Sequence, residues 1–201
     1  MISNTQRVMK KTIFTTPGIT HFFRFISYII LRLTGWKLTN VEVTKGLDKC
    51  VIIAAPHTSN WDFPLTIMLA FSARMPIYWI GKEEMFMFPF RSFMRWMGGI
   101  PVNRSKAQGL VDFAADTIKD SDSLYLIIAP EGTRTKVNHW KSGFYRMANT
   151  ADVPILLGYI DFKKKRGGFL ELFHPTGDYQ KDIDVIQAKY THISGKRPNN
   201  G

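Results

Sequence analysis

Apolar runs of strand length alternate with helical patterns along most of the chain, and this alternation limits the fold more than any other feature. The longest runs are CVIIAAP, PIYWIG, LYLIIAP and PILLGYID, at residues 50–56, 76–81, 124–130 and 154–161. Their continuous apolar character is typical of strands that are buried on both faces. Strands that alternate with helices favour a parallel sheet. We therefore expect an α/β fold with a mostly parallel, mixed sheet flanked by helices.

Weaker signals complete this pattern. Further strands are expected in WKLTNVEV (36–43), GGIPVN (98–103) and FLELF (169–173). Helices are expected over 62–74, after Pro89, from a capping box of Ser105 and Gln108 to about 119, near 142–149 and over 180–191.

The size of the chain favours one domain. It has 201 residues, of which 45% are hydrophobic, and this suits one globular core rather than two. We place the α/β domain at residues 37–195, between a basic apolar segment (1–36) and a disordered tail (196–201). A single cysteine, Cys50, excludes an intramolecular disulfide and favours a reducing compartment.

Positive charge is concentrated near the N-terminus. The net charge is +11, and residues 1–49 hold eight Lys/Arg and two Asp/Glu, which is +6. Such a segment favours an anionic partner, which could be nucleic acid, acidic lipid or a phosphorylated substrate.

The segment ITHFFRFISYIILRLTGW (19–36) narrows this choice. Its uncharged run between Arg24 and Arg32 is only FISYIIL, well short of the roughly 20 apolar residues of a membrane-spanning helix. In a helix, His21, Arg24, Tyr28 and Arg32 would form one narrow stripe and apolar residues would cover the rest. This pattern favours an amphipathic helix that lies in a membrane interface, and a helix packed against the domain core is the alternative.

Polar residues follow several of the predicted strands. His57 and Asp62 follow the strand at 50–56, Lys82 follows PIYWIG, Arg104 follows GGIPVN, and EGTR (131–134) follows LYLIIAP. Ligands of open α/β sheets bind at the carboxyl ends of the strands. These groups could therefore converge on one site.

His57 and Asp62 can form a general-base pair. A histidine takes up a proton near neutral pH, and a carboxylate on its other ring nitrogen orients it. The chain has no GxSxG elbow, and Ser59 is too near in sequence to be an attractive nucleophile. The pair thus suits a reaction in which the substrate supplies a hydroxyl to attack an activated acyl group. The alternative is that Asp62 only caps the following helix.

The EGTR turn is suited to phosphate. Backbone N–H groups of a turn that contains Gly and Thr can bind phosphate oxygens, as can the guanidinium of Arg134, and Arg104 could add a second guanidinium. For either arginine the alternative is a surface ion pair. Lys82, Lys136 and Lys141 are weaker candidates. No metal site is expected, because no HxxxH or CxxC pairing is present.

Four blocks of the sequence resemble a known family. HTSNWD (57–62) matches the HxxxxD motif of the glycerolipid acyltransferases, the family of 1-acyl-sn-glycerol-3-phosphate acyltransferase. GGIPVNR (98–104), PEGTR (130–134) and VPILLGY (153–159) are similar to its second, third and fourth blocks, in the same order.

The resemblance implies roles for these residues. His57 would take the proton from the hydroxyl of a lysophospholipid while Asp62 orients it, and the oxygen would attack the thioester of acyl-CoA or acyl-carrier protein. The acceptor and its phosphate would be held by Arg104, Glu131, Gly132, Thr133 and Arg134. The expected acceptor is lysophosphatidic acid, and no cofactor is needed beyond the thioester co-substrate.

Several alternatives remain at this point. The acceptor could be another lysolipid or glycerol-3-phosphate, the pair could serve a lipid-ester hydrolase, or the chain could be a non-catalytic basic lipid-binding protein. Nucleic acid is not expected, because the N-terminal aromatic residues lie in an apolar helix rather than on an exposed stacking platform. We expect a peripheral or monotopic protein on the cytoplasmic side of an anionic membrane. The segment MFMFPFRSFMRWM (85–97) suits either a lipid tail or an ordinary core helix.

Overall fold

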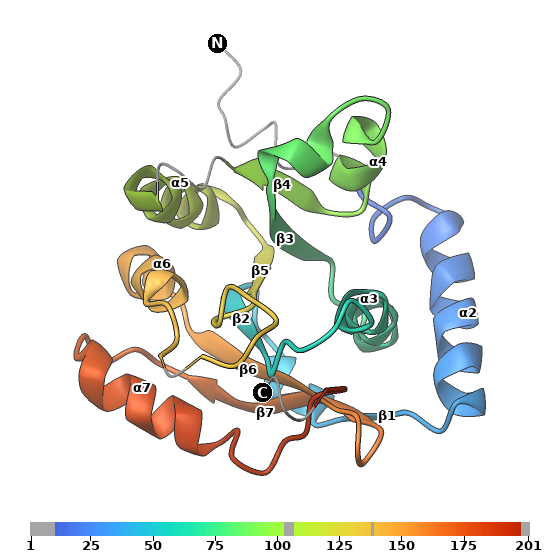
Figure 1. The fold of residues 1–201 in the computed structure, drawn as a ribbon. Helices are drawn as coiled ribbons and strands as arrows, with labels where there is room; N and C mark the ends of the chain where they lie inside the picture. The colour runs from blue at the N-terminus through green and yellow to red at the C-terminus, as the bar shows by residue number, and fades with distance from the viewer. Residues whose placement is uncertain (1–10, 103–106, 138, 198–201) are drawn as a thin grey trace.

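A seven-stranded sheet forms the centre of the protein (Figure 1). The computed structural model describes residues 11–102, 107–137 and 139–197. The strand order is β1-β7-β6-β2-β5-β3-β4. The strands are β1 (Lys37–Thr39), β2 (Lys49–Ala55), β3 (Ile77–Lys82), β4 (Gly99–Val102), β5 (Leu124–Ile128), β6 (Ile155–Asp161) and β7 (Arg166–Phe173). All neighbours pair in parallel except β6 and β7, which are antiparallel. The predicted single α/β domain with a mostly parallel, mixed sheet is confirmed.

Helices cover both faces of the sheet. In Figure 1, α5 (Ala107–Asp120), α6 (Gly143–Ala151) and α7 (Tyr179–Ala188) lie on one face, and α3 (Asp62–Ala73) lies on the other. The helix α2 (Ile19–Leu33) packs on the outside of α3. The short α4 (Arg91–Trp96) lies near β4, and two 3₁₀ turns complete the structure, η1 (Val41–Thr44) and η2 (Glu83–Phe86).

The central strand β2 is buried on both faces, which explains its continuous apolar sequence. Val51 and Ile53 belong to the core under α5 and α6, whereas Cys50 and Ile52 belong to the core under α3. Burial raises the pKa of the Cys50 thiol, so this thiol stays protonated and packs as a small apolar group.

The predicted strand at 36–43 is wrong in its second half. β1 ends at Thr39, and Asn40 adopts a left-handed conformation with φ 56°. The side-chain amide of Asn40 donates to the carbonyls of Phe169 and Leu170 in β7. This anchor turns the chain out of the sheet and into η1. The predicted capping residue Ser105 lies outside the described residues.

The N-terminal segment packs against the domain with one face and leaves its other face exposed. Ile13 and Phe14 are buried in the core under α3, and α2 buries Ser27 and Leu31. Arg24 is half-buried rather than on an exposed stripe. The outward surface of α2 carries exposed apolar side chains, namely Ile19, Phe22, Phe25, Tyr28, Ile30 and Leu33.

Within the described residues, no helix combines the length and the apolar character needed to cross a membrane.

Candidate active site

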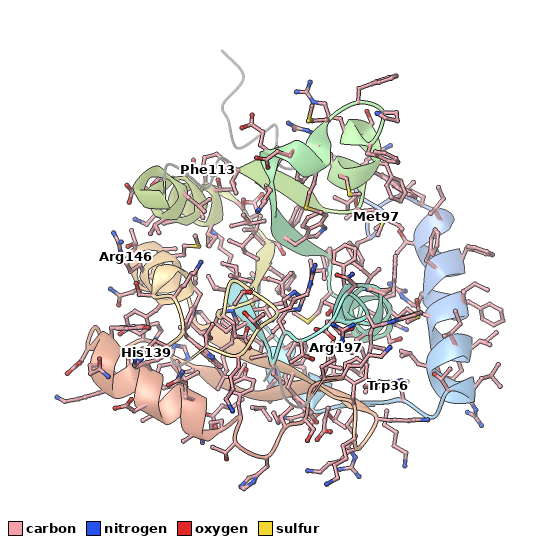
Figure 2. The ribbon with its side chains drawn as sticks, in the orientation of Figure 1. Trp36, Met97, Phe113, His139, Arg146 and Arg197 are labelled. Atoms are coloured by element: carbon pink, nitrogen blue, oxygen red, sulfur yellow. The ribbon has the colours of Figure 1, made fainter. Side chains whose placement is uncertain are left out.

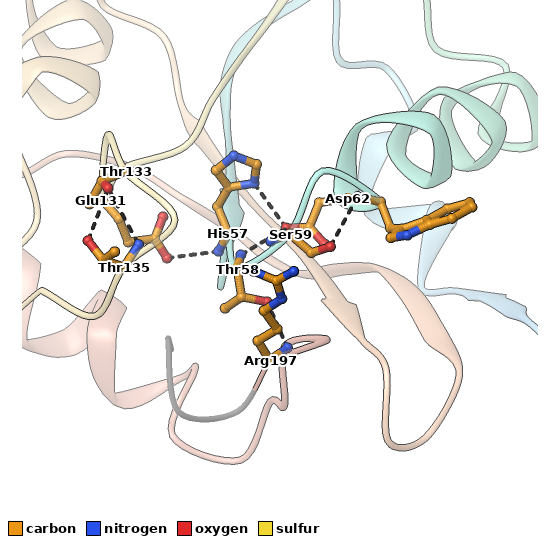
Figure 3. Close-up of polar contacts among 9 residues, drawn as sticks. His57, Thr58, Ser59, Asp62, Glu131, Thr133, Thr135 and Arg197 are labelled. Atoms are coloured by element: carbon orange, nitrogen blue, oxygen red, sulfur yellow. Dashed lines mark hydrogen bonds and ion pairs between the residues drawn. The ribbon is translucent and has the colours of Figure 1, made fainter.

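The loop between β2 and α3 brings His57 and Asp62 together (Figure 3). Asp62 is the first residue of α3, and its Oδ2 lies 3.0 Å from Nδ1 of His57. The same oxygen accepts hydrogen bonds of 2.8 Å from the backbone N–H groups of Thr58 and Ser59. Both N–H groups belong to the loop before α3, and the N-terminus of α3 has no side-chain cap. Asp62 therefore does not cap the helix, which was the alternative that the sequence offered, but holds the loop and contacts the histidine.

The contact with Asp62 defines which nitrogen of His57 faces the cleft. When Nδ1–H donates to a carboxylate, Nε2 is left as the proton acceptor. Asp62 is buried, whereas the His57 side chain is 25% exposed. A substrate can therefore reach the imidazole, while the carboxylate that orients it is shielded from water.

The side chain of Glu131 contacts the backbone of His57. It follows β5 in the PEGTR block, its side chain is buried, and its Oε1 accepts a 3.1 Å hydrogen bond from the backbone N–H of His57. Its other oxygen, Oε2, is also buried and has no hydrogen-bond partner among the described residues. Burial raises the pKa of the Glu131 carboxyl, and hydrogen bonds from backbone N–H groups, including that of His57, offset only part of this effect.

The turn after Glu131 depends on a glycine. Gly132 has φ +66°, a conformation that favours glycine. A Cβ at this position would also come within 2.9 Å of the Lys141 side chain. The backbone N–H of Lys141 in turn donates to the carbonyl of Pro130. These contacts place Lys141 against the turn that carries Arg134.

Most of the predicted site residues line one cleft of about 1140 Å³. The predicted residues on its wall are His57, Asp62, Lys82, Gly132, Thr133, Arg134 and Lys141, whereas Glu131 and Lys136 are not on it. Arg104 lies outside the described residues. It follows β4, whose last residue Val102 pairs with Lys82 at the end of β3. Among the described residues, no group of three or more His, Cys, Asp or Glu side chains is placed to hold a metal ion.

Much of the cleft wall is apolar. Ile67 and Ala70 of α3, Trp79 of β3, and Met85 and Met94 from the segment around η2 and α4 line it. Trp79 is itself held by edge-on contact with Phe63 and by Phe86. The cleft thus joins a histidine, cationic side chains and an apolar wall.

The sequence prediction missed the C-terminal contribution to this site. The backbone N–H of Arg197 donates to Oγ1 of Thr58 at 3.3 Å, and Lys196 Nζ lies 4.3 Å from the centre of the Trp61 ring. Figure 2 shows Arg197 beside the loop at the middle of the molecule. The prediction of a disordered tail is therefore wrong for residues 196 and 197, which are packed on the active-site loop. No pattern in KR could have indicated this contact.

Comparisons with known proteins identify the family of the chain and proteins of similar fold. The model of the Acyltransferase family matches residues 36–157. No curated protein sequence matches the chain. The fold is similar to the crystal structure of the 1-acyl-sn-glycerophosphate (LPA) acyltransferase PlsC from Thermotoga maritima, with a TM-score of 0.63 and 17% sequence identity over 85% of this chain and 76% of that one.

At this identity the structural likeness shows the fold alone, whereas the family model covers more than half of the chain and includes three of the four blocks in full and most of the fourth. The chain belongs to the acyltransferase family, and the resemblance to the glycerolipid acyltransferases that its sequence predicted is confirmed.

Proposed function

We propose that the protein transfers a fatty acyl group from acyl-CoA or acyl-carrier protein to the hydroxyl of 1-acyl-sn-glycerol-3-phosphate, giving phosphatidic acid. The observation that carries this proposal is the 3.0 Å contact between His57 and Asp62 at the wall of a cleft that is partly cationic and partly apolar. A neighbour of the same fold is described as an LPA acyltransferase.

The reaction needs no nucleophile from the protein. Nε2 of His57 takes the proton from the acceptor hydroxyl while the oxygen of that hydroxyl attacks the carbonyl carbon of the thioester. The carbon–sulfur bond then breaks, and the leaving thiolate receives the proton from His57. Asp62 holds the imidazole in the required orientation and stabilises the imidazolium. General-base assistance of this kind contributes about 10²–10⁴-fold to a rate.

The cationic part of the cleft suits the acceptor's phosphate. Arg134 is exposed on the cleft wall, so its guanidinium is accessible for a forked contact with phosphate. Lys82 and Lys141 line the same cleft, and Arg104 is proposed as a second arginine. The carboxylate of Glu131 binds the backbone N–H of His57 rather than the substrate, so we assign Glu131 to the positioning of His57.

The apolar part suits the acyl chains. Met85, Met94 and Trp79 form a wall with little polarity, and flexible methionines adapt to an alkyl chain. A purely lipid-binding protein would also use this wall, but it would gain nothing from a carboxylate-oriented histidine.

We also propose that the protein works as a peripheral or monotopic protein on the cytoplasmic, anionic surface of a membrane. Two surfaces support this proposal. The outer face of α2 is apolar beside Arg32, and the segment around η2 and α4 exposes Met87, Phe88, Phe90 and Phe93 beside Arg91. Phe88 is 95% exposed. Apolar side chains flanked by cations are typical of interfacial binding.

An acyl-transfer assay tests the function directly. The purified protein is incubated with acyl-CoA or acyl-carrier protein and a panel of lysolipids, with lysophosphatidic acid expected to be the best acceptor. His57→Ala should lower kcat by about 10² or more, whereas His174→Ala, an exposed histidine outside the cleft, should not. Full activity in His57→Ala would overturn the general-base assignment.

A further inference from the structure

The segment Ser194–Arg197 lies across the loop that carries His57 and Asp62. It is anchored at its start, because the backbone N–H of Phe162, just after β6, donates to the Ser194 carbonyl at 2.8 Å. It then reaches the loop through the hydrogen bond from Arg197 to Thr58 and the contact of Lys196 with Trp61. Figure 3 shows Arg197 next to Thr58.

The closest approach is made by Gly195, which is buried. A Cβ on Gly195 would lie 2.5 Å from Oγ1 and 2.6 Å from Cγ2 of Thr58. The φ of Gly195 lies outside the left-handed region, so backbone conformation does not require glycine here. Glycine is needed because the segment passes directly over Thr58.

Thr58 is the residue through which this contact reaches the base. It is 1% exposed, and its backbone N–H donates to Oδ2 of Asp62, the atom that also faces His57. The segment therefore holds the side chain of Thr58 while Asp62 holds its backbone. A shift of Thr58 would displace one of the donors that orient the Asp62 carboxylate.

We propose that Ser194–Arg197 is a strap that positions the catalytic loop, and that Gly195 is a positioning residue for acyl transfer. This inference rests on the proposed function. The strap fixes Thr58, Thr58 and Ser59 fix the Asp62 carboxylate, and the carboxylate fixes the imidazole of His57. Displacing a catalytic group by about 1 Å lowers a rate by about 10²-fold.

The test is Gly195→Ala in the full chain, with kcat and both KM values measured in the acyl-transfer assay. The added methyl group would collide with the side chain of Thr58, so Thr58 and the segment must move apart and the loop loses its support. We therefore expect kcat to fall at least about tenfold while the KM of donor and acceptor stay within about twofold, as expected for a loss confined to the transition state. Gly109→Ala is the matched control, because a Cβ there meets nothing within 4 Å. Wild-type kcat in Gly195→Ala would overturn the strap.

A second substitution separates positioning from general damage. Thr58→Ala removes Oγ1 and Cγ2 and leaves only its Cβ, which is 3.1 Å from the position that a methyl group on residue 195 would occupy. Adding Gly195→Ala to Thr58→Ala should then cause no further loss of kcat. Such non-additivity identifies direct coupling between the two residues. If the losses of kcat in the two single variants added up in the double variant, the proposal would be contradicted.

Hydrogen exchange distinguishes a failure of the strap from a failure of the proposed function. The backbone amides of Thr58 and Ser59 should exchange faster in Gly195→Ala than in the wild type and Gly109→Ala. If the wild type transfers no acyl group to any lysolipid, the proposed function fails. The exchange rates of the Thr58 and Ser59 amides then still test whether the strap holds the loop. Equal exchange in all three proteins would overturn the strap.

Discussion

The backbone N–H of His57 donates to Oε1 of Glu131 at 3.1 Å, although the two residues are 74 positions apart in the chain. The PEGTR block is therefore linked to the HTSNWD loop by a hydrogen bond between the main chain of His57 and the side chain of Glu131. The carboxylate that makes this bond is buried, and its pKa is raised. Glu131 thus fixes the backbone of His57, and burial disfavours the charged form of its carboxyl group.

Replacing Glu131 with glutamine should change stability in a pH-dependent way. Glu131→Gln keeps an oxygen for the His57 N–H and removes the buried charge. Because the folded-state pKa is raised above 4.5, the favourable contribution of this group is present at low pH and is lost as pH rises through the raised pKa. The free energy of unfolding of Glu131→Gln, measured in urea, should therefore increase relative to the wild type between pH 4.5 and pH 7.

Glu131→Ala provides the comparison for that experiment. It leaves the His57 N–H without its acceptor, which costs about 1–3 kcal/mol at either pH. If the difference between Glu131→Gln and the wild type did not change with pH, the carboxyl would not be titrating as its burial implies.

The two roles of Asp62 can be separated by substitution. Asp62→Asn retains an oxygen for the Thr58 and Ser59 amides but loses the negative charge beside His57. We expect kcat to fall by about 10²–10⁴-fold with little change in thermal stability. Asp62→Ala should lose activity and also stability, by about 1–3 kcal/mol for each buried N–H left unpaired.

Asp184→Asn, at an exposed position of α7, controls for the loss of one carboxylate. Full kcat in Asp62→Asn would show that the charge of Asp62 has no part in the reaction.

The sheet was largely predictable because its signal is local. Residues 50–53 are apolar throughout, and both faces of β2 are in fact buried. The early end of β1 was not predictable, because it depends on Asn40 bonding to β7, about 130 positions away. Propensity alone favours a strand for Val41–Val43, and this tertiary contact overrides it.

In the candidate site, too, the residues with a local sequence signal could be predicted and the contacts between distant residues could not. His57, Asp62 and the EGTR turn are marked by residue type and by their place after strands. The contact of Glu131 with the His57 backbone and that of Gly195 with Thr58 involve ordinary residues that meet only in the folded chain. Periodicity carries no information about such contacts, since neither residue lies in a repeating pattern.

Arg134 is expected to act on the acceptor more than on the donor. Its guanidinium is exposed at the cleft, and a hydrogen bond to a charged group contributes about 1.5–3 kcal/mol. Arg134→Ala should therefore raise the KM for lysophosphatidic acid by at least about tenfold, with a much smaller change in the donor KM. Lys136→Ala, exposed two residues away and outside the cleft, is the matched control. Equal changes in both KM values would contradict a phosphate-binding role.

Membrane binding should depend on the outer face of α2. Deleting residues 1–36 would not test this cleanly, because Ile13 and Phe14 are part of the core. Phe22, Phe25 and Leu33 are 59%, 62% and 82% exposed, so replacing all three with asparagine should leave the fold intact.

Because burying one such side chain contributes about 1.5–3 kcal/mol, the triple variant should bind anionic phospholipid vesicles at least about tenfold more weakly in a sedimentation assay. Val185→Asn removes a similarly exposed apolar side chain from α7, on the other face of the sheet, and should bind as the wild type does. If the triple variant sedimented like the wild type, the lipid contact would have to lie elsewhere, and the exposed segment around Phe88 would be the next surface to change.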